Sequence, residues 1–585
     1  MKIKILNIKN NIVFIIYKLL NSQQKKSLIF LFILVGFSIL FEMLGIGILL
    51  PAIGVILNKN IAVTYPSVLP ILKFIGNPNQ VKLIAITMVL IAIIFILKSF
   101  FLIYLSWVQS KFGSTLTYEL NNKLFKGYLN QDYFFHLNNN SAILLRNIQN
   151  IGQFTAVTQA LINLSVEISL VVSIFAFMVF IEPLGSISVA IFLIIFVGLF
   201  QSFTRKKLLK WGYLKQKYSG EANMYLLQGL GGVRDIKIYG KENYFSNQFS
   251  KVNKELTNLM VKYGITNLLP RIYLELISIL GLVTLVLIML FQDNDPARLI
   301  GVIGVFSIAA YRLIPSMNRI MSSTQVFKNS KASIDLIFSE ILEIEKIVEK
   351  NDKFNHEINF NNSISFENVS FSYPSSNKSV LNNISIDFKK GDYVGIVGGS
   401  GAGKSTMIDL LIGLYNPTNG CIKIDNINLL DCKKSWQNKI GYVPQNIYLF
   451  DDTILNNIAF GIPKDEINLE KLRTALIEAE LFDFVESLPD GLNTKIGERG
   501  SRLSGGQKQR IGIARALYNN PSIIIFDEAT NSLDKLTEKK IIESIDKLKG
   551  VRTIISITHN TSTIAKCDKI YQIKDGCLFE KNYTT

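Results

Sequence analysis

The stretch that decides the fold is Gly398-Gly-Ser-Gly-Ala-Gly403-Lys404-Ser405. It follows the apolar run Tyr393–Val397, which suits a buried strand, and it opens the helical pattern Thr406–Leu414. Glycines let backbone N–H groups curl around phosphate oxygens, and the following helix presents its positive end to the same anion. The spacing predicts a strand–loop–helix site for ATP, in which Lys404 bridges the β- and γ-phosphates and Ser405 holds Mg²⁺. The expected nucleotide contacts are Gly398, Ser400, Gly401, Gly403, Lys404, Ser405 and Thr406.

Two carboxylates, Asp527 and Glu528, end the later apolar run Ile523–Phe526. Continuous apolar runs of this kind, repeated at Ile554–Ile557, are typical of a parallel sheet that is buried on both faces. Beside the phosphate loop, Asp527 can orient Mg²⁺ through water, and Glu528 can polarise the attacking water as a general base. Such a pair taken alone is more often a solvated turn, but its position after the phosphate loop favours the catalytic interpretation.

A third motif, Leu503-Ser504-Gly505-Gly506-Gln507, precedes the helical stretch Lys508–Leu517. With this motif between the phosphate loop and the acidic strand end, the chain resembles the ABC ATPases, whose signature sequence has this form. The resemblance implies that Ser504 and Gly506, with Gly505 and Gln507 beside them, bind the γ-phosphate of an ATP molecule that a second subunit holds. The contact again uses a helix N-terminus.

The same resemblance assigns the remaining residues of the nucleotide site. Tyr373 resembles the aromatic residue that stacks on adenine, although by itself it would be interpreted as a core residue at a strand end. Gln445 matches the glutamine that senses Mg²⁺ and touches the membrane domain, and Asp534 matches the loop that couples two ATP sites. His559 follows a strand pattern, as the switch histidine for the γ-phosphate does in this family. The chain departs from exporters at Asn560, where they often carry Arg.

The composition is that of a membrane protein. Hydrophobic residues make up 49% of the 585 residues, and the mean hydropathy is +0.29. Six apolar stretches approach the roughly 20 residues that a helix needs to cross a bilayer. They are Leu28–Leu50, Leu83–Trp107, Ala160–Ile181, Leu184–Phe203, Tyr273–Phe291 and Leu299–Pro315. The net charge of +17 could suggest nucleic acid, but basic residues facing an anionic cytoplasmic leaflet explain it better, so no nucleic-acid partner is expected.

Basic residues concentrate in Lys2–Lys26, Lys111–Arg146 and Arg205–Lys262, which places these segments on the cytoplasmic side. The lysine-rich start runs directly into a long apolar stretch and therefore predicts an uncleaved membrane anchor. The two long loops mix apolar and charged residues at helical spacing, so the membrane helices should continue past the bilayer. We expect short crosswise helices near Asp132–Asn138 and Val233–Tyr239 that touch a cytoplasmic partner domain.

The composition changes near Asn351, and alternating strand patterns begin at Ser363. The predicted fold is an α-helical membrane domain of exporter type, with six transmembrane helices, fused to an α/β P-loop ABC ATPase domain. The expected limits are 1–345 for the membrane domain, 346–362 for a linker and 363–585 for the ATPase domain. The four cysteines have no metal-binding spacing, which favours ordinary thiols in a reducing cytosol.

The chain contains one phosphate loop and one signature sequence. In the ABC arrangement each ATP lies between the phosphate loop of one domain and the signature sequence of its partner. The resemblance therefore implies that two chains pair head to tail. Because every ATPase motif is intact, a homodimer with two working sites is favoured over a heterodimer with one degenerate site.

Three basic residues, Lys98, Arg271 and Arg312, lie within or beside the apolar stretches. Such groups are costly in lipid and usually face a protein interior or a water-filled path. Lining one cavity, they would suit an anionic cargo such as a pyrophosphate. The alternative is simple pairing, of Arg271 with Glu275 four residues later and of Lys98 with Glu42.

A narrower resemblance bears on this choice. Pro270-Arg-Ile-Tyr-Leu-Glu275, Tyr311-Arg-Leu-Ile-Pro-Ser-Met-Asn-Arg319 and Tyr442–Phe450 are similar to PglK-type flippases for lipid-linked oligosaccharides. The resemblance implies a polyprenyl-pyrophosphate-linked glycan as cargo, turned to the outer leaflet of the bacterial cytoplasmic (inner) membrane. Arg271 and Arg312 are the cavity arginines that it carries over, with Lys98 in place of another basic residue. An ABC exporter of other lipids, drugs or peptides is the alternative, because it would share every ATPase motif.

Overall fold

The computed structural model describes residues 12–48, 80–181, 183–291, 296–351, 356–374, 378–529, 534–558 and 561–581. The chain divides into two compact units. The first comprises Met1–Gln131 and Asn139–Lys346, and the second comprises Asp132–Asn138 and Ile347–Thr585. A short segment that lies between two helices of the first unit therefore belongs to the second.

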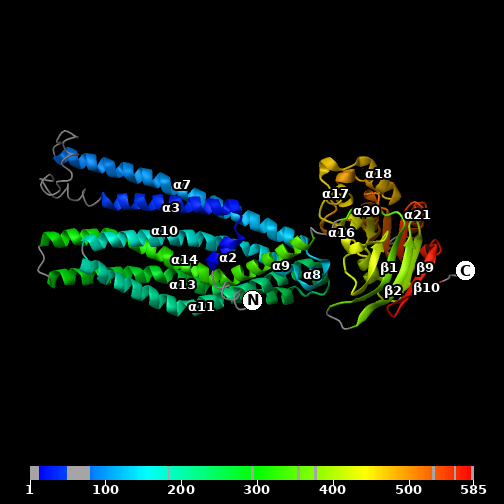
Figure 1. Cartoon of the computed structure of the whole chain (residues 1–585), viewed down its shortest axis with the longest axis horizontal. Coiled ribbons are helices and arrows are strands. Elements are labelled where there is room, and N and C mark those ends of the chain that lie inside the picture. The colour runs from blue at the N-terminus through cyan, green and yellow to red at the C-terminus, as the bar shows by residue number, and fades with distance from the viewer. Residues whose placement is uncertain are drawn as a thin grey trace. The chain divides into compact units, whose positions relative to one another are not determined.

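The first unit is built from long helices that lie side by side (Figure 1). In it, α11 packs against α13, α3 packs against α7, and α10 contacts both α7 and α11. The helices are α2 (Ile12–Leu19), α3 (Ser22–Gly47), α7 (Gln80–Leu129), α9 (Ser141–Gln149), α10 (Ile151–Ile181), α11 (Pro183–Gly231), α12 (Val233–Ile238), α13 (Glu242–Phe291) and α14 (Pro296–Asn351).

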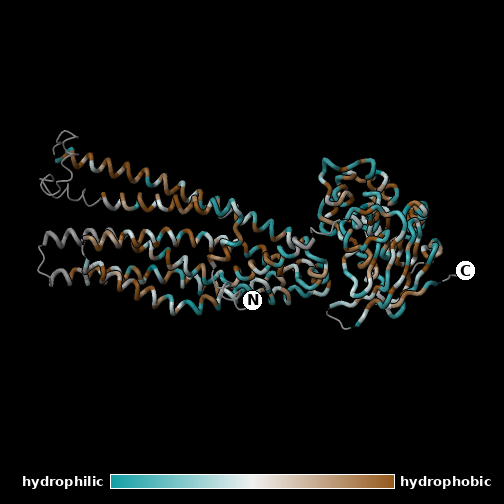
Figure 2. Tube along the Cα trace, viewed as in Figure 1, coloured by the Kyte–Doolittle hydropathy of each residue, from teal (hydrophilic) through white to brown (hydrophobic). Residues whose placement is uncertain are grey.

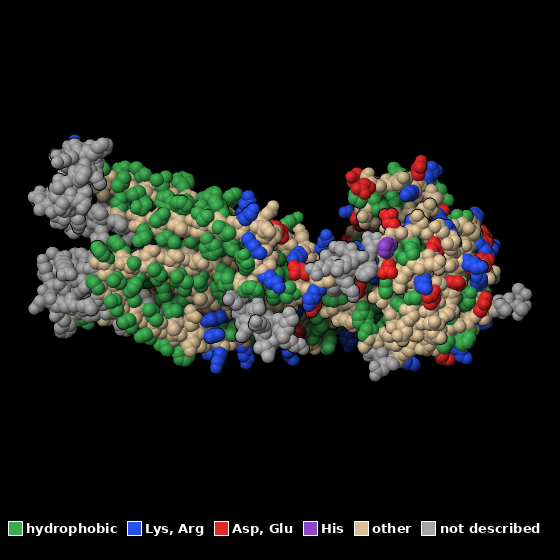
Figure 3. Space-filling view, viewed as in Figure 1, with side chains coloured by type: hydrophobic (Ala, Val, Ile, Leu, Met, Phe, Trp, Pro, Cys, Tyr) green, Lys and Arg blue, Asp and Glu red, His purple; other side chains and the backbone are tan. Residues whose placement is uncertain are grey.

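In the part of the chain that the structure describes, four helical segments are long and apolar enough to cross a membrane: Ser22–Gly45, Gln80–Leu129, Ser141–Phe180 and Glu242–Thr284. The other two predicted stretches lie in α11 and α14, some of whose side chains are outside the described set. Hydrophobic residues run along these helices (Figure 2), and their side chains cover much of the visible surface of this unit (Figure 3). Phe180 is 89% exposed and Ile194 is 71% exposed. Such a surface is costly in water and is stable in lipid.

The helices extend well beyond a bilayer. The 50 residues of α7 span about 75 Å at 1.5 Å per residue, whereas the hydrocarbon core is about 30 Å thick. The sequence prediction that the membrane helices continue past the bilayer is therefore confirmed, whereas the cytoplasmic placement of their extensions stays a prediction. Both short helices expected in the loops are present, as α8 (Tyr133–Asn138) and α12 (Val233–Ile238).

The second unit contains two sheets. An antiparallel sheet has the order β2-β1-β4-β5, and a six-stranded sheet has the order β10-β9-β3-β8-β7-β6 and is parallel except for β10. The strands are β1 (Ser363–Ser372), β2 (Ser379–Lys389), β3 (Tyr393–Gly398), β4 (Asn419–Ile424), β5 (Ile427–Asn428), β6 (Ile440–Val443), β7 (Ile523–Asp527), β8 (Thr553–Ile557), β9 (Lys569–Lys574) and β10 (Cys577–Glu580).

Helices cover these sheets (Figure 1). They are α15 (Lys404–Leu411), α16 (Leu429–Gln437), α17 (Ile454–Ile458), α18 (Leu469–Glu478), α19 (Phe482–Glu486), α20 (Gly505–Tyr518), α21 (Lys535–Asp546) and α22 (Thr561–Ile564). Every residue of β3, β7 and β8 is buried, as their continuous apolar sequences predicted. Because β3 and β7 both run parallel to β8 between them, the carboxyl ends of β3 and β7 meet at one edge of the sheet. This edge is where ligands bind in open α/β sheets.

The division into 1–345, 346–362 and 363–585 stays a prediction. Within the proposed linker, residues 352–355 lie outside the described part of the chain. The compact units separate between Lys346 and Ile347, and the second also includes residues 132–138.

Candidate functional site

The phosphate loop connects β3 to α15. Its backbone enters the left-handed region at Gly401 (φ 76°) and Gly403 (φ 105°), conformations that favour glycine. A Cβ at Gly403 would lie 2.8 Å from Leu381 Cδ2, so a side chain would also collide there. The loop therefore needs glycine both for its path and for its packing. It delivers the chain to the N-terminus of α15, where free N–H groups can bind an anion.

Lys404 is the first residue of α15 and is only 8% exposed. Its ammonium donates hydrogen bonds to the carbonyl oxygens of Gly398 (2.8 Å) and Gly399 (3.0 Å). The Lys404 ammonium is thus held at the loop by two carbonyl oxygens, which are uncharged acceptors. A phosphate group would offer the ammonium a charged acceptor, which makes a stronger hydrogen bond. The loop, the helix N-terminus and Lys404 together fit a nucleotide phosphate chain.

Four described residues of the expected nucleotide site lie on or beside this loop: Ser400, Ser405, Thr406 and Tyr373. Ser400 and Ser405 are exposed, so their hydroxyl groups are available to a ligand. The Tyr373 hydroxyl lies 3.1 Å from Thr406 Oγ1, and its ring meets the Tyr415 ring edge-on at 5.8 Å. The tyrosine is therefore anchored beside the loop. Its stacking on adenine stays a prediction.

The carboxylate edge lies at the end of β7. Asp527 is 7% exposed and accepts a hydrogen bond from the Tyr442 hydroxyl at 3.4 Å. Burial raises the pKa of Asp527, and the charge of Glu528 raises it further. The hydrogen bond from Tyr442 and the charge of Lys404 lower this pKa, but burial is the largest effect. The hydroxyl of Ser405, in the first turn of α15, and the Asp527 carboxylate are oxygen ligands of the kind that Mg²⁺ prefers, so these residues fit the expected cation.

Glu528 follows directly and adopts φ 50°, an uncommon conformation for a residue with a side chain. Its N–H donates to the Ile557 carbonyl at 2.9 Å, and its Oε2 accepts from Gln445 Nε2 at 2.8 Å. Strained backbone of this kind is common at functional sites. The structure thus brings Gln445 and Glu528 into direct contact, although they are 83 residues apart.

Sequence reasoning missed two residues beside this cluster. Tyr442 lies on β6, which pairs with β7, and its hydroxyl reaches Asp527. Asp409, on α15, has its pKa raised to about 6 by burial and, secondarily, by the charge of Asp527. The available sequence signal for Asp409 was a single acid within the otherwise apolar run Met407-Ile-Asp-Leu-Leu411.

The signature motif forms the start of α20. Ser504 is the N-cap, its side chain accepts from the Gln507 N–H at 3.3 Å, and Gln507 Oε1 accepts from the Ser504 N–H at 2.8 Å. This capping box presents Gly505 and Gly506 in the first turn. Ser504 and Gly505 are exposed. Across the described residues, no hydrogen bond joins 504–507 to the phosphate loop of the same chain.

Asp534 is the N-cap of α21 and accepts from the Thr537 N–H at 3.0 Å. This backbone hydrogen bond lowers the pKa of the Asp534 carboxyl. His559 and Asn560 lie outside the described residues. The role of His559 stays a prediction from the sequence.

The three cargo candidates do not form one cluster. Lys98 is 4% exposed, and its Nζ lies 2.6 Å from Glu42 Oε2. An Arg312 guanidinium nitrogen lies 3.6 Å from the same carboxylate oxygen. Arg271 instead pairs with Glu275 at 3.1 Å on the same helix. The structure therefore brings Lys98 and Arg312 together around Glu42, and both pairings foreseen as the alternative are present. The cargo role of these residues stays a prediction.

Comparisons with known proteins cover both units. Residues 27–308 match the family described as "ABC transporter transmembrane region", and residues 381–531 match "ABC transporter". An ATP-dependent lipid A-core flippase of Wigglesworthia glossinidia brevipalpis is 34% identical over 488 residues, which are 82% of this chain and 81% of the relative. A putative multidrug export ATP-binding/permease protein of Bacillus subtilis is 29% identical over 86% of this chain and 87% of its own length.

A solved structure is also similar. It is described as a bacterial Atm1-family ABC exporter with ATP bound, and it has a TM-score of 0.76 and 26% sequence identity. The similarity covers 93% of this chain and 94% of that one. The likeness therefore extends over the membrane helices and the α/β unit together.

Proposed function

Since the chain belongs to the ABC transporter family, as a half-transporter whose ABC ATPase is coupled to transport through the membrane, we propose that its cargo is a polyprenyl-pyrophosphate-linked oligosaccharide. We place it in the bacterial cytoplasmic (inner) membrane, with the ATPase domain in the cytoplasm. The working unit is a homodimer that turns the glycolipid from the cytoplasmic to the outer leaflet.

The proposed ATP site is shared by two chains. One chain supplies the phosphate loop, with Lys404 on the phosphates and Tyr373 toward the adenine. The partner supplies the exposed start of α20, with Ser504 and Gly506 directed at the γ-phosphate. The absence of any hydrogen bond between the described signature residues and the loop of their own chain supports this division. ATP then favours the closed dimer, because only there do both chains bind its γ-phosphate.

Around this nucleotide the chain's own residues have distinct tasks. Ser405, Gln445 and Asp527 would hold Mg²⁺, which neutralises phosphate charge when bound. Glu528 would accept a proton from the attacking water as general base. Gln445 holds the Glu528 carboxylate at 2.8 Å, so it orients this base. We assign His559 to the γ-phosphate and Asp534 to the coupling of the two sites.

Transmission to the membrane would pass through α8. Although it is part of the loop between α7 and α9, α8 belongs to the compact ATPase unit. The rings of Tyr133 and Phe134 contact the Tyr415 ring at centroid distances of 5.9 Å and 6.4 Å. Tyr415 also contacts Tyr373. Rings thus connect the predicted adenine contact to α8, which follows the membrane helix α7 in the chain.

One observation carries the cargo proposal: Lys98 and Arg312 share the single carboxylate of Glu42. Two cations beside one anion leave an excess positive charge among apolar residues. Such a charge is energetically costly unless an anionic ligand neutralises it. A pyrophosphate would supply the missing negative charge. The relative from Wigglesworthia glossinidia brevipalpis moves lipid A-core according to its name.

Proteoliposomes containing the purified homodimer test this cargo. The measurement is ATP-dependent movement of a fluorescent polyprenyl-pyrophosphate glycan between leaflets, beside lipid A and cationic dyes in parallel vesicles. We expect the pyrophosphate glycan to move and Arg312→Ala to slow it at least tenfold while ATP hydrolysis continues. The Arg271→Ala variant tests in the same assay whether the second arginine implied by the resemblance contributes to movement of the glycan. Transport of the dyes without the glycan would reject the proposal in favour of drug export.

A further inference from the structure

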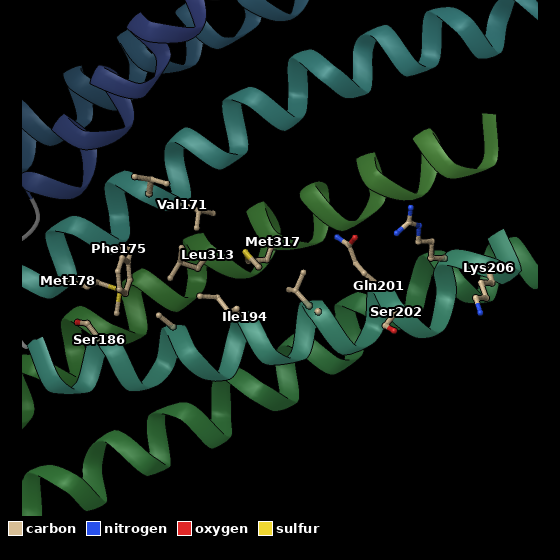
Figure 4. Close-up of a pocket in the computed structure, with 15 residues that line it drawn as sticks. Val171, Phe175, Met178, Ser186, Ile194, Gln201, Ser202, Lys206, Leu313 and Met317 are labelled. Carbon is tan, nitrogen blue, oxygen red and sulfur yellow. The ribbon is translucent and has the colours of Figure 1, made fainter. Parts of the chain in front are cut away.

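A cavity of about 850 Å³ lies between α10, α11 and α14, within the membrane unit (Figure 4). Its two ends differ in chemistry. Val171, Phe175 and Met178 lie toward one end, whereas Gln201, Ser202 and Lys206 lie toward the other. The space is therefore amphipathic along the direction of the helices. None of Lys98, Arg271 and Arg312 lines it, so it is distinct from the cargo residues proposed above.

The polar end carries uncompensated positive charge. Arg205 and Lys206 line the cavity, and Lys328 of α14 lies with its Nζ 3.4 Å from Gln201 Oε1. Among the described residues, no carboxylate lies within 4.0 Å of these three cations. Burial lowers the pKa of Lys328, and the positive charge of Arg205 lowers it further, because the two cations repel each other. An anion among them would relieve this repulsion.

The position of the cations along the chain indicates their depth. The apolar stretch of α11 ends at Phe203, and Arg205, Lys206, Lys207 and Lys210 follow it. A change from apolar to basic residues marks the cytoplasmic surface of the membrane. The cavity therefore extends from headgroup level on the cytoplasmic side into the hydrocarbon region.

We propose that this cavity holds one anionic lipid of the cytoplasmic leaflet, with a hydrocarbon chain between α10, α11 and α14 and its phosphate at Arg205, Lys206 and Lys328. The volume is in the range of sites that enclose a single ligand. The match of an apolar space with a cationic end selects a phospholipid over a neutral lipid and over free phosphate. The site does not depend on which glycan the protein moves.

Native mass spectrometry of the full-length protein in detergent tests the headgroup contact. Phosphatidylglycerol is titrated beside phosphatidylcholine with the same acyl chains. We expect the double variant Arg205→Gln/Lys328→Gln to bind phosphatidylglycerol roughly 30-fold more weakly, about fivefold per cation, with phosphatidylcholine binding almost unchanged. The matched control is Lys207→Gln/Lys210→Gln, which removes two exposed charges from α11 outside the cavity. An equal loss in the control would show that general surface charge holds the lipid and would overturn the site.

A second pair of variants tests the chain contact. Gly198 lines the cavity, and a Cβ there would meet open space, so Gly198→Leu places a side chain inside without a backbone clash. We expect this variant to weaken both lipids by tenfold or more. Gly264→Leu, on α13 and also facing open space, is the control and should bind both as the unaltered protein does. Unchanged lipid binding by a Gly198→Leu protein with an unaltered melting temperature would exclude a chain in this cavity.

Discussion

Glu528 combines a left-handed backbone with a side chain held by Gln445. A Glu528→Gln variant keeps an oxygen acceptor for Gln445 but loses the basic carboxylate. We expect it to bind ATP with normal affinity and to hydrolyse it at least 100-fold more slowly, since a general base contributes roughly that much. Equilibrium nucleotide binding and phosphate release, measured on the same purified protein, separate the two effects. Turnover within threefold of the unaltered protein would show that another group is the base.

Asp409 makes stability depend on pH. Its folded pKa of about 6 lies above the ordinary value of 3.8 for an aspartate, so the fold favours the protonated form. The stabilising contribution of Asp409 to the free energy of unfolding is fully present below the pKa of the unfolded chain, and it is lost as the pH rises through about 6. We expect Asp409→Asn, which cannot ionise, to be more stable than the unaltered chain at pH 8 by about 1–2 kcal/mol, after discounting for partial exposure.

Thermal unfolding of the full-length protein at pH 4.5 and pH 8 measures this difference. The Asp409→Asn advantage should be largest at pH 8 and should shrink on acidification. An advantage of the same size at both pH values would mean that ionisation of Asp409 is not its cause.

Among the elements, α8 is the one whose packing suggests a transmission role. Tyr415→Leu removes the ring that contacts Tyr133, Phe134 and Tyr373. We expect transport to fall at least fivefold more than ATP hydrolysis does, because ring movements would no longer reach α8. Tyr415→Phe keeps the ring and should restore coupling. Phe579→Leu, an exposed aromatic substitution on β10, is the control. Equal losses of transport and hydrolysis in Tyr415→Leu would argue for a purely structural role.

The elements could be predicted from sequence where the pattern is local. The phosphate loop needs glycine at Gly403 for a left-handed turn, and the continuous apolar run before Asp527 could only be a doubly buried strand or a core helix. Both α8 and α12 were expected from amphipathic segments. Periodicity cannot report contacts between distant residues. The Gln445–Glu528 hydrogen bond and the sharing of Glu42 by Lys98 and Arg312 therefore required coordinates.

The nucleotide site shows the same limit. Its residue types followed from motif spacing, but the buried surroundings of Asp409 and the hydroxyl contact between Tyr373 and Thr406 did not. Both depend on residues far from α15 in the sequence, namely Asp527 at the end of β7 and Tyr373 just after β1. The cargo candidates Lys98 and Arg271 were equally visible as charges in apolar stretches, yet one is buried beside Glu42 and the other is exposed beside Glu275. Only packing distinguishes them.

At the scale of the whole molecule, we propose that each ATP is bound between two chains. The exposed signature helix and the phosphate loop of one chain have no hydrogen bond between them in the described residues. Two head-to-tail chains would bring each motif to its counterpart. Export would then require two chains, because ATP can favour the closed state only when a second chain also binds its γ-phosphate.

Site-directed cross-linking tests this claim most directly. Two differently tagged chains, both carrying Glu528→Gln and serine at the four native cysteine positions, are co-expressed with Ser400→Cys in one and Ser504→Cys in the other. With ATP and a short thiol-reactive cross-linker, the account predicts a covalent heterodimer that carries both tags, and little of it without nucleotide. A doubly substituted single chain that cross-links within itself, while the co-expressed pair yields no heterodimer, would contradict it.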